Sequence, residues 1–292
     1  MVEVSKADYE YFNGAVRQFT TESSVLVSSS KYLNHAPLRA LIAQEFLRRN
    51  GPDMPNTAYI PEVAQILHNL EDMGEIMRLF EVEKQRLPEF RTWLDRRLLS
   101  DFKAEDVAHC QPGTLGFVIH DFIVNSGYNM DVFFQGMKVD SDYTFYLKER
   151  ALTHDIEHMV TGFGTNNGGE IALLAANTRA LHLYFCPELA AYFNRVGAYL
   201  KAKSILKSSL HHPRAIPIQL DAEDRGAAQG RSWKLPLMLV AWRELIDVSI
   251  EEIRQEYGII DAPPPGYWAE SNELSEDPRY PADVAPQSIA AE

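Results

Sequence analysis

The 292-residue sequence predicts an all-α protein in which many helices pack as a single domain. Apolar residues recur at helical spacing in every long segment. Few segments alternate with the period of two that a half-buried strand requires. Apolar residues make up 46% of the chain and charged residues 24%, so a core can form without disulfide bonds.

Prolines and glycines mark the helices of the first half. Pro37, Pro61 and Pro88 each stand where a run of helical spacing begins. Proline fits the first turn because its missing N–H is not needed there. Gly51 ends the first run, as glycine commonly does after a helix. The expected helices are residues 37–50, residues 61 to about 86, a helix opening at residue 88, and the strongly apolar segment 113–126.

Four more helices are expected in the second half, at residues 140–161, 170–186, 188–210 and about 232–257. The pattern changes at Asp261, after which the last 32 residues hold six prolines, seven acidic residues and one arginine. Such a segment buries too little apolar surface to offset the entropy lost on ordering. We therefore expect a helical domain over residues 1–260 and a disordered acidic tail over residues 261–292.

The charge and the cysteines exclude several classes of protein. The net charge is −13, and binding to nucleic acid is not expected because neutralising phosphates needs a basic face. Cys110 and Cys186 match no ligand spacing, which makes the cytoplasm the expected compartment. The first residues are acidic where a signal peptide would be basic and apolar, and no apolar run approaches the ~20 residues of a membrane span.

One segment departs from the acidic balance. Residues 189–220 contain no acidic residue, and within residues 195–210 the basic Lys201, Lys203 and Lys207 accompany an apolar stripe. This combination is typical of helices that meet anionic lipid headgroups. The alternative is a solvated basic face over a core stripe, because lysines near a helix C-terminus are favourable in any case.

The densest group of candidate metal ligands lies in residues 153–170, THDIEHMVTGFGTNNGGE. His154 and His158 are four residues apart, so both imidazoles leave one face of a helix and one ion can bridge them. Asp155 can reach the same ion or orient a histidine. Four glycines then break the helix, at about 1 kcal/mol each. Glu170 opens the next helix and can point back at the histidines.

Two imidazoles and two carboxylates suit zinc, manganese or ferrous iron better than magnesium or calcium, which prefer oxygen ligands. The sequence thus predicts a divalent-metal site between two consecutive helices. Alternatively, Asp155 and Glu170 stabilise helix ends through the helix dipole. A metal phosphohydrolase also has an adjacent His-Asp pair, but its further histidines and distant aspartate are not recognisable by spacing here.

His-Asp-x-x-His, followed by eleven residues and Glu, resembles the signature motif of the coenzyme Q biosynthesis protein 4 family. The resemblance covers about residues 30–260 and departs at Ile156-Glu157, where the family more often has an apolar or aromatic pair. Further segments that carry it are PGTLG at 112–116, GGEIAL at 169–174, Arg225, Gly226, Gly230, Trp242, Glu244 and EEIRQEYGI at 251–259.

The resemblance implies that His154, Asp155, His158 and Glu170 bind one divalent metal, usually zinc, with iron or manganese as alternatives. It implies a polyprenylated hydroxybenzoate-type substrate and a lyase or oxidoreductase activity, oxidative decarboxylation and hydroxylation at ring carbon C1. Glu170 and Asp155 would then be catalytic. Implied partners are other ubiquinone biosynthesis proteins, an isoprenoid lipid, the inner membrane as a peripheral attachment, and a second copy of the chain. The alternative within the family is a non-catalytic lipid-binding scaffold for the biosynthetic enzymes.

Overall fold

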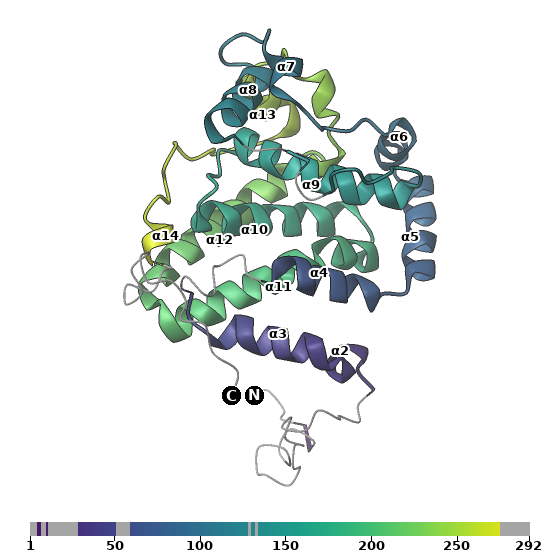
Figure 1. The fold of residues 1–292 in the computed structure, drawn as a ribbon, viewed down its shortest axis with the longest axis vertical. Helices are drawn as coiled ribbons and strands as arrows, with labels where there is room; N and C mark the ends of the chain where they lie inside the picture. Colours follow the sequence, from purple (N-terminus) through teal and green to yellow (C-terminus); the bar gives the residue numbers. More distant parts are fainter. Residues whose placement is uncertain are drawn as a thin grey trace.

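The computed structural model describes residues 5–6, 10, 29–50, 59–127, 130–131 and 134–274 (Figure 1). Within these ranges the chain is helical, without β-strands, and one isolated antiparallel bridge joins Thr114 and Ser249. The predicted all-α fold is confirmed. The helices are α2 (Lys31–Asn34), α3 (Ala36–Leu47), α4 (Ile60–Asn69), α5 (Met73–Arg86), α6 (Pro88–Arg96), α7 (Ala104–Val107), α8 (Leu115–Ser126), α9 (Asp142–Thr161), α10 (Asn167–Tyr184), α11 (Pro187–His211), α12 (Ile216–Ser232), α13 (Ile250–Tyr257) and α14 (Ser271–Leu274), with 3-10 turns η1 (Pro213–Ala215), η2 (Leu237–Leu239) and η3 (Trp242–Glu244).

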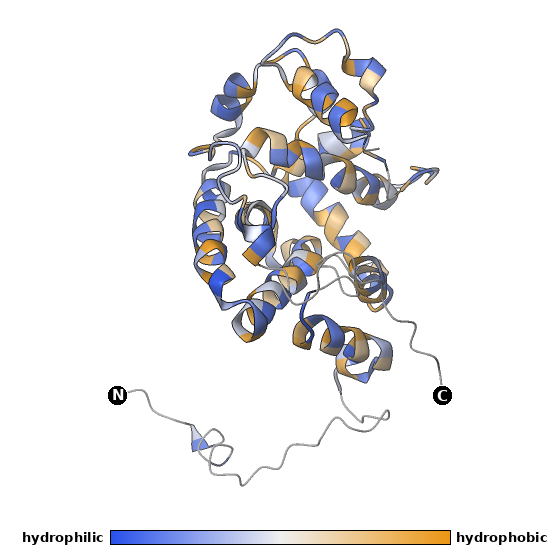
Figure 2. Cartoon of the chain, turned by 60° about the vertical axis from the view of Figure 1, so that its left-hand side comes forward, coloured by the Kyte–Doolittle hydropathy of each residue, from blue (hydrophilic) through white to orange (hydrophobic). Residues whose placement is uncertain are grey.

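Helix α10 lies at the centre of the fold, between α9 and α11 (Figure 1). It begins at Asn167 because the side chain of Asn166 accepts a hydrogen bond from the Gly169 N–H at 2.9 Å. Its buried residues, including Ala172 and Leu173, join the main core cluster with residues of α9, α12 and α13. The outer helices carry both hydrophilic and hydrophobic residues (Figure 2). No described helix is long and apolar enough to cross a bilayer.

Helix α12 approaches α10 backbone to backbone. A Cβ built on Gly226 would lie 2.0 Å from the carbonyl oxygen of Ala172, and one on Gly230 would lie 2.2 Å from that of Ala176. No side chain fits in this space, so the two glycines allow the close contact of the helices. This contact fixes the position of α10.

Gly226→Ala is expected to lower the free energy of unfolding by about 1–3 kcal/mol, because α12 must move away from α10. Urea denaturation measures the change. Gly74→Ala is the matched control, since a Cβ on Gly74 meets only a side-chain oxygen of Asp72, at 3.2 Å. An equal loss of stability in the two variants would contradict the argument.

Three of the longer helical regions differ from the sequence expectation. Residues 61–86 contain two helices, because the Asp72 carboxylate accepts a hydrogen bond from the Glu75 N–H at 3.1 Å and starts α5. Helix α12 was not expected, since its glycines lower helix propensity. The helix expected at about 232–257 is confined to α13, because Pro236 interrupts it and residues 237–248 form a partly buried irregular segment.

Residues 261–274 pack on the helical body, which differs from the disorder expected from residue 261 onward. Trp268 is buried, donates a hydrogen bond from Nε1 to Asp221 Oδ2 at 2.9 Å, and lies 5.9 Å from the Phe163 ring centroid. Burial of a large aromatic side chain stabilises the packing of such a segment, and average composition does not register a single anchoring residue. Residues 275–292 lie outside the described residues.

The basic stretch 195–210 lies in α11 and turns two of its three lysines inward. Lys203 and Lys207 are both buried: Lys203 Nζ lies 2.9 Å from Glu45 Oε2, and Lys207 Nζ donates to Asn50 Oδ1 at 2.8 Å. These lysines hold the α3 region against α11 and do not face lipid headgroups, so that part of the expectation is wrong. The apolar side chains that are exposed on this helix are Ile205, Leu206 and Leu210.

A buried carboxyl on α9 makes stability depend on pH. Ser100 donates to the Glu149 carboxylate twice, from its N–H at 2.8 Å and from its Oγ at 2.6 Å. Burial raises the pKa of Glu149 to about 8, although the hydrogen bonds from Ser100 act in the opposite direction. The pKa of Glu149 is higher in the folded state than in the unfolded state. Its contribution to the free energy of unfolding is therefore complete below the unfolded pKa, and this contribution is lost as pH rises through the folded pKa.

Glu149→Gln is expected to remove a fall of about 2 kcal/mol in the free energy of unfolding between about pH 6 and pH 8. A glutamine keeps partners for both groups of Ser100 and has no proton to lose. Urea titrations of wild type and variant at the two pH values measure the effect. Parallel pH dependence in the two proteins would show that Glu149 does not titrate in this range.

Candidate metal centre

Helices α9 and α10 bring three donor groups to one point. His154 and His158 stand four residues apart on α9, and Glu170 lies in the first turn of α10. The two Nε2 atoms are 3.3 Å apart, and the Glu170 carboxylate oxygens lie 3.5 Å from His154 Nε2 and 3.2 Å from His158 Nε2. Nitrogen and oxygen ligands around a tetrahedral zinc ion are separated by about 3.3–3.6 Å. The spacing fits one ion of that size.

The turn between the two helices positions Glu170. Gly162 ends α9 with a φ of 77°, and its N–H donates to the His158 carbonyl at 3.1 Å. A Cβ on Gly169 would lie 1.6 Å from the Gly164 carbonyl oxygen, so only glycine lets the loop fold back onto the first turn of α10. The helix break expected from the glycines is confirmed.

A hydrogen bond to the main chain orients the His158 ring. Its side chain is 4% exposed, and its Nδ1 lies 2.8 Å from the Phe163 carbonyl oxygen. Because a carbonyl only accepts, Nδ1 carries the hydrogen, which leaves Nε2 as the ring atom that faces Glu170. The side chains of His154 and Glu170 are 36% and 40% exposed, so the site opens to solvent on one side.

The charges of the three groups are linked. Burial raises the pKa of Glu170, but hydrogen bonds from the two imidazoles outweigh it and hold this pKa well below its usual range. Burial lowers the pKa of His158, and the Glu170 carboxylate reverses the shift and raises it. The site therefore favours a positive charge between its donors. A metal ion would compete with a proton there, which would make metal affinity dependent on pH.

Asp155 lies beside this point. The donor atoms within 4.8 Å of one another belong to His154, His158 and Glu170, and Asp155 is not among them. At 3.6 residues per turn, position 155 is rotated by about 100° from position 154. Burial raises the pKa of the half-buried Asp155 carboxyl, and the two imidazoles oppose this rise. The structure brings three of the four predicted ligands together.

A buried group of hydrogen-bonded side chains centred on Glu157, close to the two histidines, was not predicted. Glu157 is fully buried, and its two carboxylate oxygens accept from Arg150 Nη1 at 3.2 Å and from Asn177 Nδ2 at 2.8 Å. Asn177 belongs to α10, so its hydrogen bond to Glu157 joins α9 to α10 close to the histidines. Two features of the sequence could have indicated this group of hydrogen bonds. Glu157 is charged where the resemblance favours an apolar residue, and Asn177 is a lone asparagine in an apolar helix.

The segment after Asp261 supports the same first turn of α10. Ser271 Oγ accepts from the Gly168 N–H at 3.0 Å, and Asn272 Oδ1 accepts from the Asn167 N–H at 2.9 Å. These N–H groups have no partner within their own helix. A Cβ on Gly168 would lie 2.5 Å from Trp268 Cβ, so this segment sits directly on the turn that carries the Glu170 carboxylate.

A cavity of about 330 Å³ lies apart from these residues, between α6, the η2 region and α13. None of the four predicted ligands lines it. Its walls are formed by Pro88, Glu89, Thr92, Trp93, Arg96, Leu98, Leu235, Leu239, Val240, Ala241 and Tyr257.

Comparison with known proteins identifies the family. The sequence profile of the coenzyme Q (ubiquinone) biosynthesis protein Coq4 family matches residues 95–263, which include His154, His158 and Glu170. A candidate ubiquinone biosynthesis protein from Nostoc punctiforme has a solved structure with 25% sequence identity and a TM-score of 0.54. That likeness covers 70% of this chain and 90% of the other. A search of curated proteins found no match. Because the profile spans more than half of the sequence, the chain belongs to the coenzyme Q (ubiquinone) biosynthesis protein Coq4 family.

Proposed function

We propose that this protein carries out a metal-dependent step of ubiquinone biosynthesis on a polyprenylated hydroxybenzoate-type ring. The supporting observation is the convergence of His154, His158 and Glu170 on one point. Two histidines and one glutamate are a ligand set of catalytic zinc sites, which keep a fourth position open. The exposed side of His154 and Glu170 gives a substrate access to that position.

The proposed reaction is oxidative decarboxylation with hydroxylation at C1 of the ring. When bound, the ion would supply a Lewis acid for the substrate carboxylate or the neighbouring phenolic oxygen. Replacing a carboxylate by a hydroxyl group releases carbon dioxide and is a two-electron oxidation, so every ion requires an oxidant such as oxygen. With zinc the oxidant would have to act on the ring directly, whereas iron or manganese could pass electrons to it.

The side chains have separate roles in this proposal. His158, held by the Phe163 carbonyl, and Glu170 would hold the ion and compensate its charge. Glu170 would thereby contribute to catalysis through the ion. Asp155 stands to one side of the donor atoms, where it can contact the substrate or orient a ligand.

A non-catalytic, lipid-binding scaffold is the second candidate. The observation that favours it is the exposure of Ile205, Leu206 and Leu210 on α11, an apolar surface suited to peripheral contact with the inner membrane from the cytoplasm. In this case the ion would only join α9 to α10. Other ubiquinone biosynthesis proteins, or a second copy of the chain, would be the partners.

Product analysis separates the two candidates. Protein loaded in turn with zinc, iron or manganese is given a prenylated hydroxybenzoate-type acid with a chemical oxidant or oxygen. Mass spectrometry should detect a product in which a hydroxyl group replaces the carboxylate. A His154→Ala/His158→Ala protein serves as the control and should form none. Unchanged substrate with every ion, together with an isoprenoid retained in native mass spectra, would support the scaffold.

A further inference from the structure

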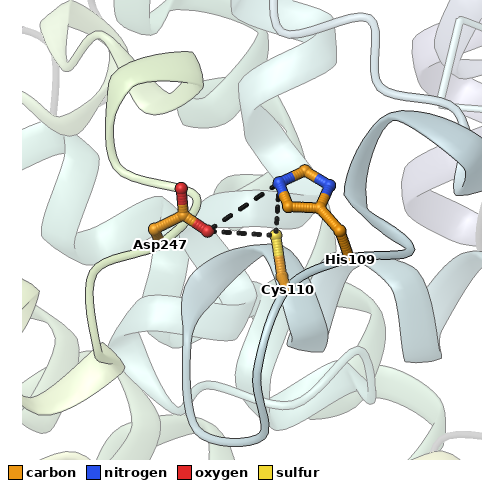
Figure 3. A group of neighbouring side chains, drawn as sticks. All are labelled: His109, Cys110 and Asp247. Atoms are coloured by element: carbon orange, nitrogen blue, oxygen red, sulfur yellow. Dashed lines mark hydrogen bonds and ion pairs between the residues drawn. The ribbon is translucent and has the colours of Figure 1, made fainter.

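A second group of metal-binding side chains lies on other elements of the fold. His109 and Cys110 follow α7, and Asp247 precedes α13 (Figure 3). Cys110 Sγ lies 3.8 Å from His109 Nε2 and 3.6 Å from Asp247 Oδ1, and these last two atoms are 3.9 Å apart. Three different donor types therefore face one point.

The spacing is close to that of a zinc site. With sulfur at about 2.3 Å and nitrogen or oxygen at about 2.0–2.2 Å from a tetrahedral ion, neighbouring donors are separated by about 3.3–3.7 Å. Small side-chain movements would bring the three donors to these distances. A thiolate among the ligands selects zinc-like ions over magnesium and calcium.

The main chain holds the two segments in register. Asp247 lies in a segment that pairs with the start of α8, so its position opposite Cys110 does not depend on side-chain packing alone. The pairing consists of three hydrogen bonds, from the Leu115 N–H to the Val248 carbonyl at 2.9 Å, from the Gly116 N–H to the Ile246 carbonyl at 2.8 Å, and from the Ile250 N–H to the Gly113 carbonyl at 3.1 Å.

The site also has space and access. A Cβ on Gly116 would lie 2.3 Å from Cys110 Sγ, so the glycine leaves room for the sulfur. Cys110 is buried, whereas the side chains of His109 and Asp247 are 63% and 72% exposed. An ion can therefore enter from solvent onto a sulfur at the floor of the site.

The same residue types occur in cysteine hydrolases, but the arrangement here differs. In a relay, the acid contacts one ring nitrogen and the nucleophile contacts the other. Both Cys110 Sγ and Asp247 Oδ1 face Nε2 of His109. A relay needs both ring nitrogens, so this arrangement does not support one. Three donor atoms around one point suit a bound ion instead.

We propose that His109, Cys110 and Asp247 form a second cation site, specific for zinc-like divalent ions and separate from the centre on α9 and α10. A bound ion would join the turn after α7 to the segment before α13, and would release the thiol proton to solvent. Three protein ligands leave one coordination position for water or a small ligand.

Titration of the full-length protein with Co²⁺ tests this site, because a cobalt–thiolate bond gives a near-ultraviolet charge-transfer band that imidazole and carboxylate donors do not give. The His154→Ala/His158→Ala background removes the first centre. We expect this protein to bind one Co²⁺ with the thiolate band, and Zn²⁺ to displace it. Adding Cys110→Ser should abolish the band, while the matched Cys186→Ser should keep it.

His109→Ala provides a second variant that leaves the fold intact, because the side chain is largely exposed. We expect its Co²⁺ affinity to fall about 10-fold or more and its metal-free melting temperature to stay unchanged. The proposal is overturned if the background protein shows no thiolate band. It is also overturned if the band survives Cys110→Ser and disappears in Cys186→Ser.

Discussion

Glu170→Gln is expected to yield a folded protein whose activity falls about 100-fold or more. The substitution keeps the shape of the side chain and one oxygen, but removes the negative charge that faces both imidazoles. A site that stabilises charge on a substrate through a bound ion depends on the total charge of its ligands. Product formation, or complementation of a strain that lacks the homologous gene, measures the loss.

Metal analysis and melting curves show what the ion does. A Glu170→Gln protein that keeps its metal and its melting temperature but fails to complement supports catalysis. If the ion only clamps α9 to α10, the melting temperature should fall together with metal affinity. His154→Ala should reduce metal content under either mechanism. Full complementation by a metal-free His154→Ala/His158→Ala protein would exclude a role for the metal.

Glu188→Gln is the matched control for a purely helical role of Glu170. Both residues are glutamates in the first turn of a long helix, α11 in one case and α10 in the other. Loss of a favourable helix-dipole interaction would cost about 0.3–1 kcal/mol in either position. Equal, small effects of the two substitutions would mean that Glu170 only stabilises a helix end.

The candidate metal site is predictable from sequence as a cluster of three side chains because its determinants are local. His154 and His158 share one helical face, and the glycine-rich turn returns the chain directly to Glu170. Helical periodicity and a turn suffice to bring these groups together. Sequence spacing did not decide whether Asp155 is a ligand. Asp155 is next to His154 in the chain, and the rotation between successive helical positions turns its side chain away from the point that the other three share.

Features that depend on distant partners were not predictable in this way. Cys110 and Asp247 are separated by 137 residues, so no spacing rule joins them. The inward face of α11 depends on Glu45, which lies on a helix far earlier in the chain. Trp268 anchors its segment through Asp221, again from another helix. Periodicity shows that a helix has two faces, and only the neighbouring helix decides which face is buried.

The buried pair between α11 and α3 allows a direct test of that orientation. Lys203→Ala is expected to lower the free energy of unfolding by about 3–5 kcal/mol, because the buried Glu45 carboxylate loses the ammonium group 2.9 Å away. Urea denaturation measures this change. The more accessible alternative on the same helix is Lys201, whose side chain is 23% exposed and whose partner Glu223 is 45% exposed. Lys201→Ala should cost about 1 kcal/mol or less.

Replacing both Lys203 and Glu45 distinguishes two causes of lost stability, the unpaired buried charge and the missing side-chain volume. A Lys203→Met/Glu45→Met protein should recover most of the stability that Lys203→Ala loses, because apolar residues of similar volume remove the unpaired charge. If these lysines instead faced lipid headgroups, Lys201→Ala and Lys203→Ala would weaken vesicle flotation to a similar degree and leave unfolding unchanged. That result would reverse the orientation of α11, and with it the assignment of Ile205, Leu206 and Leu210 to the exposed face.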